Sequence, residues 1–107
     1  MTKEEARRKL KEYRVFIDDL DRRIVALINE RTRVVEDIGR VKRNAEMPVY
    51  EPEREQQVFD NIRSVTNDDP LAQEAVRRIF ERIMEEMRMI QRLRMEANGD
   101  QPPARHE

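Results

Sequence analysis

Three polar side chains stand at positions where this sequence otherwise keeps apolar residues. Arg31 falls on the heptad repeat that starts at Leu10, and Lys42 follows 11 residues later, close to three whole helical turns. The two cations therefore share nearly one face of a helix, roughly 16 Å apart. Gln91 lies one turn beyond Met87, at the edge of another apolar face. Cations and an amide on inner helical faces predict a pocket that binds an anion and donates hydrogen bonds to developing negative charge.

Each of these side chains also has a plainer interpretation. A buried ion pair that fixes helix register accounts for Arg31 as well as a ligand does. Lys42 taken alone is typical of a solvated lysine, and Arg14, towards the other end of the same segment, is typical of a surface residue. A buried amide must be hydrogen-bonded, and a contact between two helices would satisfy Gln91.

The remaining composition excludes most other kinds of catalytic site. The only histidine is His106, in a polar tail, the only serine is Ser64, and there is no cysteine. A Ser-His-Asp triad, a histidine-based zinc site and thiolate chemistry are therefore excluded. The sequence also has no glycine-rich phosphate loop. We expect a site built from arginine, lysine, carboxylates and an amide, with no metal and no cofactor.

Charge and hydropathy limit the partners and the compartment. The 22 Lys and Arg residues nearly balance the 23 Asp and Glu residues, which gives no reason to expect nucleic-acid or membrane binding. The first residues lack the apolar stretch of a signal peptide, and no apolar run approaches membrane-spanning length. The sequence therefore predicts a cytoplasmic protein.

An all-α fold is predicted from the composition and from the spacing of apolar residues. Charged residues make up 42% of the chain and aromatics 5%, with only 2 glycines, which suits long amphipathic helices better than a sheet. Thr2 and Glu5 fit a capping box at the start of a helix that runs to about Ala45, before Pro48. Its apolar residues recur at alternating steps of three and four. We call this set the α-seam: Leu10, Tyr13, Ile17, Leu20, Ile24, Leu27, Val34, Ile38 and Val41.

The length of this first helix predicts a second chain. Roughly 40 residues of helix span roughly 60 Å, whereas a compact domain of this size is only about 30–35 Å across. The helix therefore cannot bury its whole α-seam against its own chain. An intertwined homodimer, with two long helices pairing antiparallel, is the simplest arrangement that covers it.

Two further helices follow. Pro52 suits the first position of a helix that ends near Asn67, and acidic residues at its start suit the helix dipole. Asp69 and Pro70 form an N-cap and a first-turn proline for a third helix, which ends near Asn98. We therefore predict one helical domain over residues 1–98, followed by a disordered tail over residues 99–107.

In order and spacing, these features resemble the all-α class of chorismate mutases. The resemblance covers roughly residues 5–95. It is carried by the stretches Ile17-Asp18-Asp19-Leu20-Asp21, Leu27-Ile28-Asn29-Glu30-Arg31, Ile38-Gly39-Arg40-Val41-Lys42, Pro48-Val49-Tyr50-Glu51-Pro52-Glu53-Arg54-Glu55 and Ile90-Gln91. It implies three helices per chain in an interlaced dimer with two equivalent sites, in which chorismate rearranges to prephenate.

The resemblance also implies a role for individual residues. Arg31, together with Arg14 from the other subunit, would bind the carboxylates of the substrate. Lys42 and Gln91 would donate hydrogen bonds to its ether oxygen. Three further site residues would lie at the start of the second helix: Glu51, Glu55 and Arg54. The two carboxylates would lie near the ring hydroxyl, and the resemblance assigns no contact to the arginine.

Two positions depart from the family pattern. Glu51 stands where many relatives carry aspartate, and Met87 stands where some members use a small hydroxyl residue near the ring carboxylate. Three other functions remain open on the sequence alone. They are an isochorismate pyruvate-lyase with the same fold, a non-catalytic helical module that regulates a larger enzyme of the shikimate pathway, and a structural antiparallel coiled coil.

Overall fold

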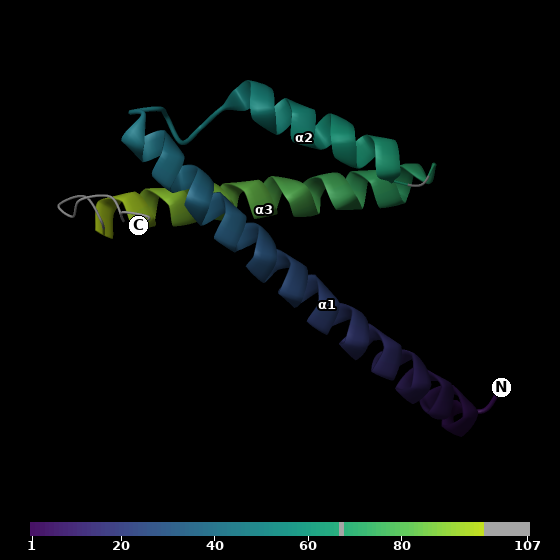
Figure 1. The fold of residues 1–107 in the computed structure, drawn as a ribbon. Coiled ribbons are helices and arrows are strands. Elements are labelled where there is room, and N and C mark those ends of the chain that lie inside the picture. The colour runs from purple at the N-terminus through teal and green to yellow at the C-terminus, as the bar shows by residue number, and fades with distance from the viewer. Residues whose placement is uncertain (67, 98–107) are drawn as a thin grey trace. The chain divides into compact units, whose positions relative to one another are not determined.

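The computed structural model describes residues 1–66 and 68–97. Three helices account for most of them: α1 (Lys3–Asn44), α2 (Pro52–Val65) and α3 (Pro70–Ala97) (Figure 1). None of these residues forms a strand, so the predicted all-α class and the long first helix are confirmed. The chain divides into two compact units, Met1–Val34 and Val35–Glu107. The predicted disordered tail, residues 99–107, lies outside the described residues.

The helix starts follow the predicted local signals. At α1 the backbone N–H of Glu5 donates to Oγ1 of Thr2 at 3.1 Å, and the N–H of Thr2 donates to the Glu5 carboxylate at 3.4 Å, which is a capping box. At α3 the carboxylate of Asp69 accepts a hydrogen bond from the N–H of Leu71 at 3.0 Å. Pro70 between them needs no partner because it has no N–H. Both predicted starts are therefore confirmed.

The end of α1 is closed by a Schellman-type turn. Glu46 adopts a left-handed backbone with φ of 57°, the N–H of Met47 donates to the carbonyl of Lys42 at 2.7 Å, and the N–H of Glu46 donates to the carbonyl of Arg43 at 3.1 Å. This turn reverses the chain directly after Lys42. It brings the following loop back over the last turn of α1.

The small core of the second unit lies where the last turns of α1 meet α3. Its buried residues are Val35, Gly39, Met84, Met87 and Gln91. Helix α2 lies beside α3 (Figure 1), and the guanidinium of Arg77 stacks 4.5 Å from the ring centre of Phe59.

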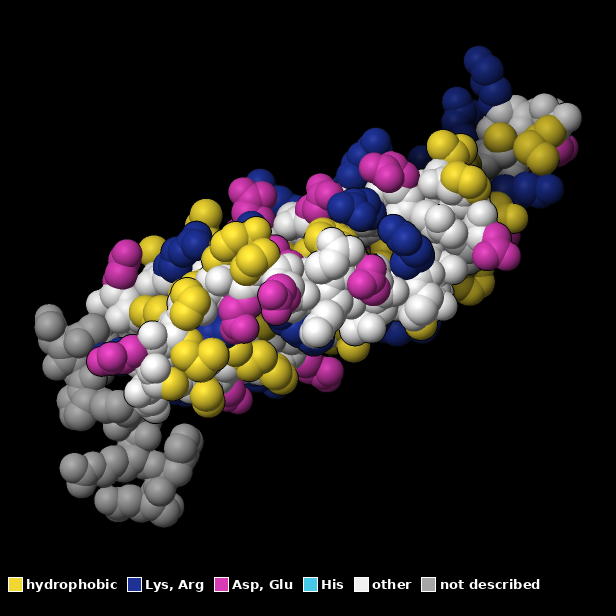
Figure 2. Space-filling model, turned by 90° about the horizontal axis from the view of Figure 1, so that it is seen from above, with side chains coloured by type: hydrophobic (Ala, Val, Ile, Leu, Met, Phe, Trp, Pro, Cys, Tyr) yellow, Lys and Arg dark blue, Asp and Glu magenta, His cyan; other side chains and the backbone are white. Residues whose placement is uncertain are grey.

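The part of the chain that the structure describes leaves the α-seam exposed. Each of its nine side chains is between 42% and 65% exposed. In the space-filling view, hydrophobic side chains lie open among charged ones over the visible face (Figure 2). No described helix combines the length and the apolar character needed to cross a membrane.

Candidate functional site

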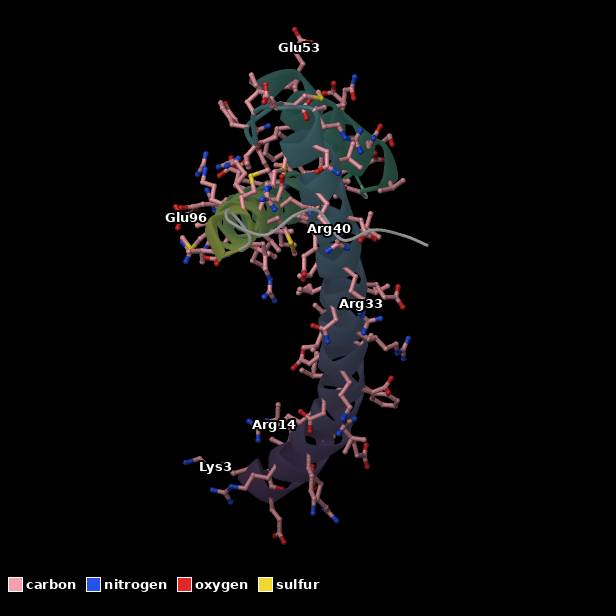
Figure 3. The ribbon with its side chains drawn as sticks, turned by 60° about the vertical axis from the view of Figure 1, so that its left-hand side comes forward. Lys3, Arg14, Arg33, Arg40, Glu53 and Glu96 are labelled. Atoms are coloured by element: carbon pink, nitrogen blue, oxygen red, sulfur yellow. The ribbon has the colours of Figure 1, made fainter. Side chains whose placement is uncertain are left out.

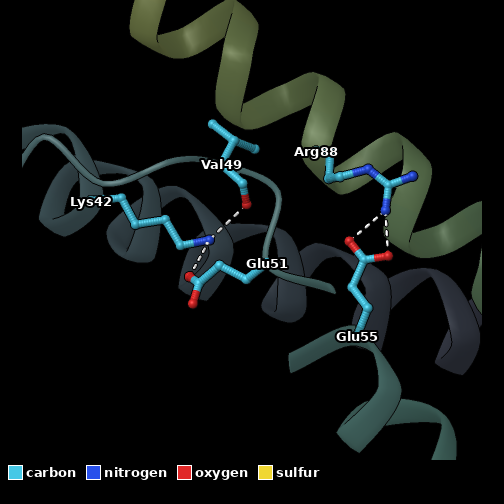
Figure 4. Close-up of polar contacts among 5 residues, drawn as sticks. All are labelled: Lys42, Val49, Glu51, Glu55 and Arg88. Atoms are coloured by element: carbon cyan, nitrogen blue, oxygen red, sulfur yellow. Dashed lines mark hydrogen bonds and ion pairs between the residues drawn. The ribbon is translucent and has the colours of Figure 1, made fainter. Parts of the chain in front are cut away.

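Lys42 is held in a fixed direction at the end of α1. Its ammonium group donates to the backbone carbonyl of Val49 at 2.9 Å and pairs with the Glu51 carboxylate at 2.9 Å (Figure 4). The side chain is only 12% exposed. Because the Schellman-type turn folds the loop back, both partners come from the segment that directly follows α1. A solvated lysine is the plainer interpretation of this position in the sequence, and the structure instead shows a largely buried and fixed cation.

Glu51 occupies the N-cap position of α2 without capping the helix through its side chain. Its carboxylate is directed to Lys42 instead. The helix dipole still favours an acidic group at this place, but the ion pair is the closer contact. The acidic start of α2 thus anchors the loop to α1.

Glu55 pairs with an arginine that the sequence analysis did not single out. The Nη1 group of Arg88, on α3, donates to both carboxylate oxygens of Glu55 (Figure 4). Both side chains are largely buried, at 24% and 21% exposure. The guanidinium also lies 5.2 Å from the centre of the Tyr50 ring. Arg88 precedes Gln91 by three residues and so shares its side of the helix, and this spacing is the signal that could have revealed it.

The pKa of Arg88 is raised above its ordinary value. The largest cause is the hydrogen bond to Glu55; burial opposes it, and electrostatic interactions with Glu55, Tyr50 and Glu85 add to it. The stability that a raised cationic pKa contributes is lost only as the pH rises through that pKa. The Arg88 side of the pair therefore stays charged throughout the neutral and alkaline range.

Gln91 lies buried against the last turns of α1. It is 7% exposed, and its Oε1 atom has no hydrogen-bond partner among the described residues. Gly39 faces this side chain, and a Cβ atom built at Gly39 would lie 3.4 Å from Cγ of Gln91, which is van der Waals contact. An unsatisfied buried amide is costly unless a ligand completes its hydrogen bonds.

A polar cavity of about 270 Å³ lies next to Gln91, within the second unit. Its wall includes an ion pair between Arg94 and Glu36 at 3.5 Å. The lining residues come from α1 and α3: Glu36, Gly39, Arg40, Arg43, Gln91, Arg94 and Met95. The Gln91 side chain therefore forms part of the wall of this cavity.

The position of Gly39 leads to a first prediction. Gly39→Ala should raise the free energy of unfolding by up to about 1 kcal/mol, because alanine favours a helix interior and its Cβ atom fits at contact distance from Gln91. Gly39→Val should destabilise the protein, because its branched side chain would have to displace Gln91. Urea denaturation of both variants checks this. A destabilised alanine variant would show that the helices pack more tightly than described.

The remaining predicted site residues lie in varied surroundings. Arg54 is exposed on α2, and its guanidinium donates to Oε1 of Gln57 at 3.3 Å. Met87 is buried in the core of the second unit. Arg14 and Arg31 belong to the first unit. Arg14 is exposed on α1 (Figure 3), and Arg31 is half-buried.

The second unit thus contains a fixed cation, a buried amide and two paired carboxylates, and of these groups only the amide of Gln91 belongs to a residue that lines the cavity. These groups can bind, orient and donate hydrogen bonds. No group of three or more histidine, cysteine or acidic side chains among the described residues is arranged to hold a metal ion. The chemistry that these residues support is electrostatic stabilisation of a bound anion.

Comparison with known proteins gives a family for this chain. A sequence model of the family described as chorismate mutase type II matches residues 13–92. This span contains every residue of the predicted site, from Arg14 to Gln91. The resemblance noted in the sequence is therefore confirmed over three quarters of the chain.

Individual relatives agree with this match. The chorismate mutase of Methanocaldococcus jannaschii is 31% identical over 88 residues, which cover 82% of this chain and 89% of that protein. The bifunctional chorismate mutase/prephenate dehydratase of Pseudomonas aeruginosa is 44% identical over 80 residues, or 70% of this chain and 22% of that enzyme. The T-protein of Haemophilus influenzae is 31% identical over 77 residues, 72% of this chain and 20% of that protein.

The matches differ in how much of each relative they cover. This chain spans most of the Methanocaldococcus jannaschii mutase but only about a fifth of the other two proteins. The similarity to those two proteins therefore concerns one segment of each and none of their other parts. By the family match and by these identities, the chain belongs to the chorismate mutase type II family.

Proposed function

We propose that this protein is a chorismate mutase, which rearranges chorismate to prephenate on the route to phenylalanine and tyrosine. The observation that carries this proposal is the family match over residues 13–92, which includes all eight predicted site residues. In the reaction the ether C–O bond breaks as a C–C bond forms within one molecule. It needs no nucleophile, proton transfer or redox partner, which agrees with a site made of arginine, lysine, carboxylates and an amide.

Lys42 and Gln91 are the groups that we propose act on the reacting atoms. Negative charge develops on the ether oxygen as its bond to carbon breaks, and fixed hydrogen-bond donors stabilise that charge more in the transition state than in the ground state. Support comes from the way both side chains are held. Lys42 is fixed by Val49 and Glu51, and Gln91 is buried against Gly39.

Substrate binding depends on the other charged residues. Chorismate carries two carboxylates, and we propose that Arg31 and the partner chain's copy of Arg14 bind them through charge-assisted hydrogen bonds. Glu55, helped by Glu51, would accept a hydrogen bond from the ring hydroxyl. Holding the compact diaxial conformer in this way lowers the barrier by orientation.

The proposed assembly is a homodimer, and the exposed α-seam supports it. Nine apolar side chains at heptad spacing, each 42% to 65% exposed, form a stripe that water should not contact in a stable protein. The small core of the single chain is a second reason, because so few buried residues stabilise little on their own. A second copy offers the matching stripe. Cytoplasmic localisation and one catalytic domain over residues 1–98 remain part of this proposal.

Dimer formation makes stability depend on protein concentration. Because folding and association would be coupled, the midpoint of thermal unfolding should rise as the protein concentration is raised. Replacing Leu20, in the middle of the α-seam, by glutamate should abolish the dimer, and light scattering coupled to size exclusion measures this. Arg22→Glu, at an exposed position outside the seam, is the control. A wild-type chain that stays monomeric at all concentrations would refute the assembly.

The function is tested by incubating the purified protein with chorismate and, separately, with isochorismate. The expected result is loss of chorismate absorbance with formation of prephenate, which acid converts to phenylpyruvate. Salicylate and pyruvate from isochorismate, without prephenate from chorismate, would identify a pyruvate-lyase instead. No turnover of either compound would leave a non-catalytic helical module.

A further inference from the structure

The Glu55 carboxylate is held by a cation that no predicted role accounts for. Arg88 reaches across from α3 to α2 and donates to both Glu55 oxygens from one nitrogen (Figure 4). The two residues are 33 positions apart in the sequence. The pair therefore depends on the packing of α2 against α3 and on no local helical spacing.

Arg88 supplies the cation that pairs with the Glu55 carboxylate. Glu51, one turn earlier in the chain, pairs with Lys42, and Glu85 on α3 pairs with Arg82 at 3.7 Å. The nearby ammonium of Lys42 is already engaged by Glu51 and the carbonyl of Val49. A partly buried carboxylate is unfavourable without a cation, and Arg88 fills this role for Glu55.

Arg88 is itself held in place. Its guanidinium lies 5.2 Å from the centre of the Tyr50 ring, in the loop that precedes α2, and it is only 24% exposed. Contact with an aromatic face on one side and a carboxylate on the other restricts the long side chain. An arginine fixed in this way can fix its partner.

We propose that Arg88 is a positioning residue. It orients the Glu55 carboxylate to accept a hydrogen bond from the ring hydroxyl of the substrate. This inference rests on the proposed function. A carboxylate has about four acceptor positions, so the two hydrogen bonds from Arg88 leave room for a hydroxyl. Without Arg88, the carboxylate would lose the two hydrogen bonds that fix its direction. Arg88 acts through Glu55 and does not touch the reacting atoms.

The test compares Arg88→Met, Arg88→Lys, Glu55→Gln and the double variant Arg88→Met/Glu55→Gln in steady-state assays with chorismate. A hydroxyl contact is present in both the ground state and the transition state, so its loss should raise KM and leave kcat nearly unchanged. We expect Arg88→Met to raise KM about tenfold with kcat within about twofold of wild type. Arg88→Lys should restore most of the lost affinity because it keeps the cation.

The double variant separates positioning from general stabilisation. If Arg88 works through Glu55, the KM of Arg88→Met/Glu55→Gln should equal that of Glu55→Gln, because the second change has nothing left to remove. Arg78→Met is the matched control, since Arg78 lies on the same helix and pairs with Glu74 but is 72% exposed. Circular dichroism confirms that each variant folds.

Four results overturn the inference. Two of them concern Arg88→Met, whose KM would be unchanged or lowered. The third is a failure of Arg88→Lys to restore affinity. The fourth is a double variant in which the KM increases of the two single variants multiply. A lowered KM would mean that the ion pair competes with the substrate for Glu55. If the wild-type protein forms no prephenate at all, the proposed function fails first. If the wild type is active and Arg88→Met matches it, only the inference fails.

Discussion

Gln91→Met is expected to make this protein more stable and nearly inactive. The Gln91 side chain is buried, and its Oε1 atom has no hydrogen-bond partner among the described residues. Methionine has a similar length and no amide to desolvate, so the free energy of unfolding should rise by about 1 kcal/mol. The variant also lacks the proposed donor to the ether oxygen. Its kcat should therefore fall by about two to three orders of magnitude.

Urea denaturation and the chorismate assay measure the two effects on the same sample. Opposite changes in stability and activity distinguish a ligand-facing amide from a structural one, because removing a structural hydrogen bond would lower both. A Gln91→Met protein that is less stable than wild type would show that the amide is satisfied inside the protein. One that keeps its activity would remove Gln91 from the mechanism.

Gln91→Glu is the isosteric companion of this variant. A carboxylic acid donates a hydrogen bond only when protonated, so activity should be present at acidic pH and be lost as the pH rises through the pKa of the new carboxyl group. The wild-type amide does not titrate, and its activity should persist through neutral and mildly alkaline pH. A pH profile identical to wild type would argue against a donor at this position.

Local signals in the sequence predicted the helices well. The capping box of Thr2 and Glu5 and the N-cap of Asp69 before Pro70 depend on residues within three positions of each other, so they can be read directly. The apolar spacing of the α-seam likewise follows from the period of one helix. The burial of Gln91 also agrees with its place one turn beyond Met87, at the edge of an apolar face.

Contacts between helices could not be predicted in the same way. The pair of Arg88 and Glu55 joins residues 33 positions apart, and no periodicity within α2 or α3 shows that these two side chains meet. Glu46 is a second case. Its left-handed backbone ends α1 at a position where glycine is the usual residue. Because this sequence has no glycine there, the turn that places the loop over Lys42 could not be predicted from the residue types. The sequence explains the acidic start of α2 by the helix dipole alone, because the partners of Glu51 and Glu55 lie on other elements.

Mixing two inactive variants is expected to restore activity, and this is the sharpest test of the proposed shared site. If each site combines Lys42 of one chain with Arg14 of the other, Arg14→Ala and Lys42→Ala should each be inactive alone. A heterodimer of the two has one site with both changes and one site with neither. Refolding an equal mixture should make half of the dimers mixed, so about a quarter of the wild-type activity should return.

The matched control for this experiment is an equal mixture of Arg31→Ala chains and Lys42→Ala chains. Both residues would serve the same site from one chain, so every site in their heterodimer lacks one of them and no activity should return. The argument depends only on which chain supplies each side chain, and it holds whatever the size of the individual effects. Recovery in neither mixture would place Arg14 in the site of its own chain or outside it. Recovery in both would mean that Arg31, like Arg14, acts across the interface, because only residues from different chains can be separated by subunit exchange.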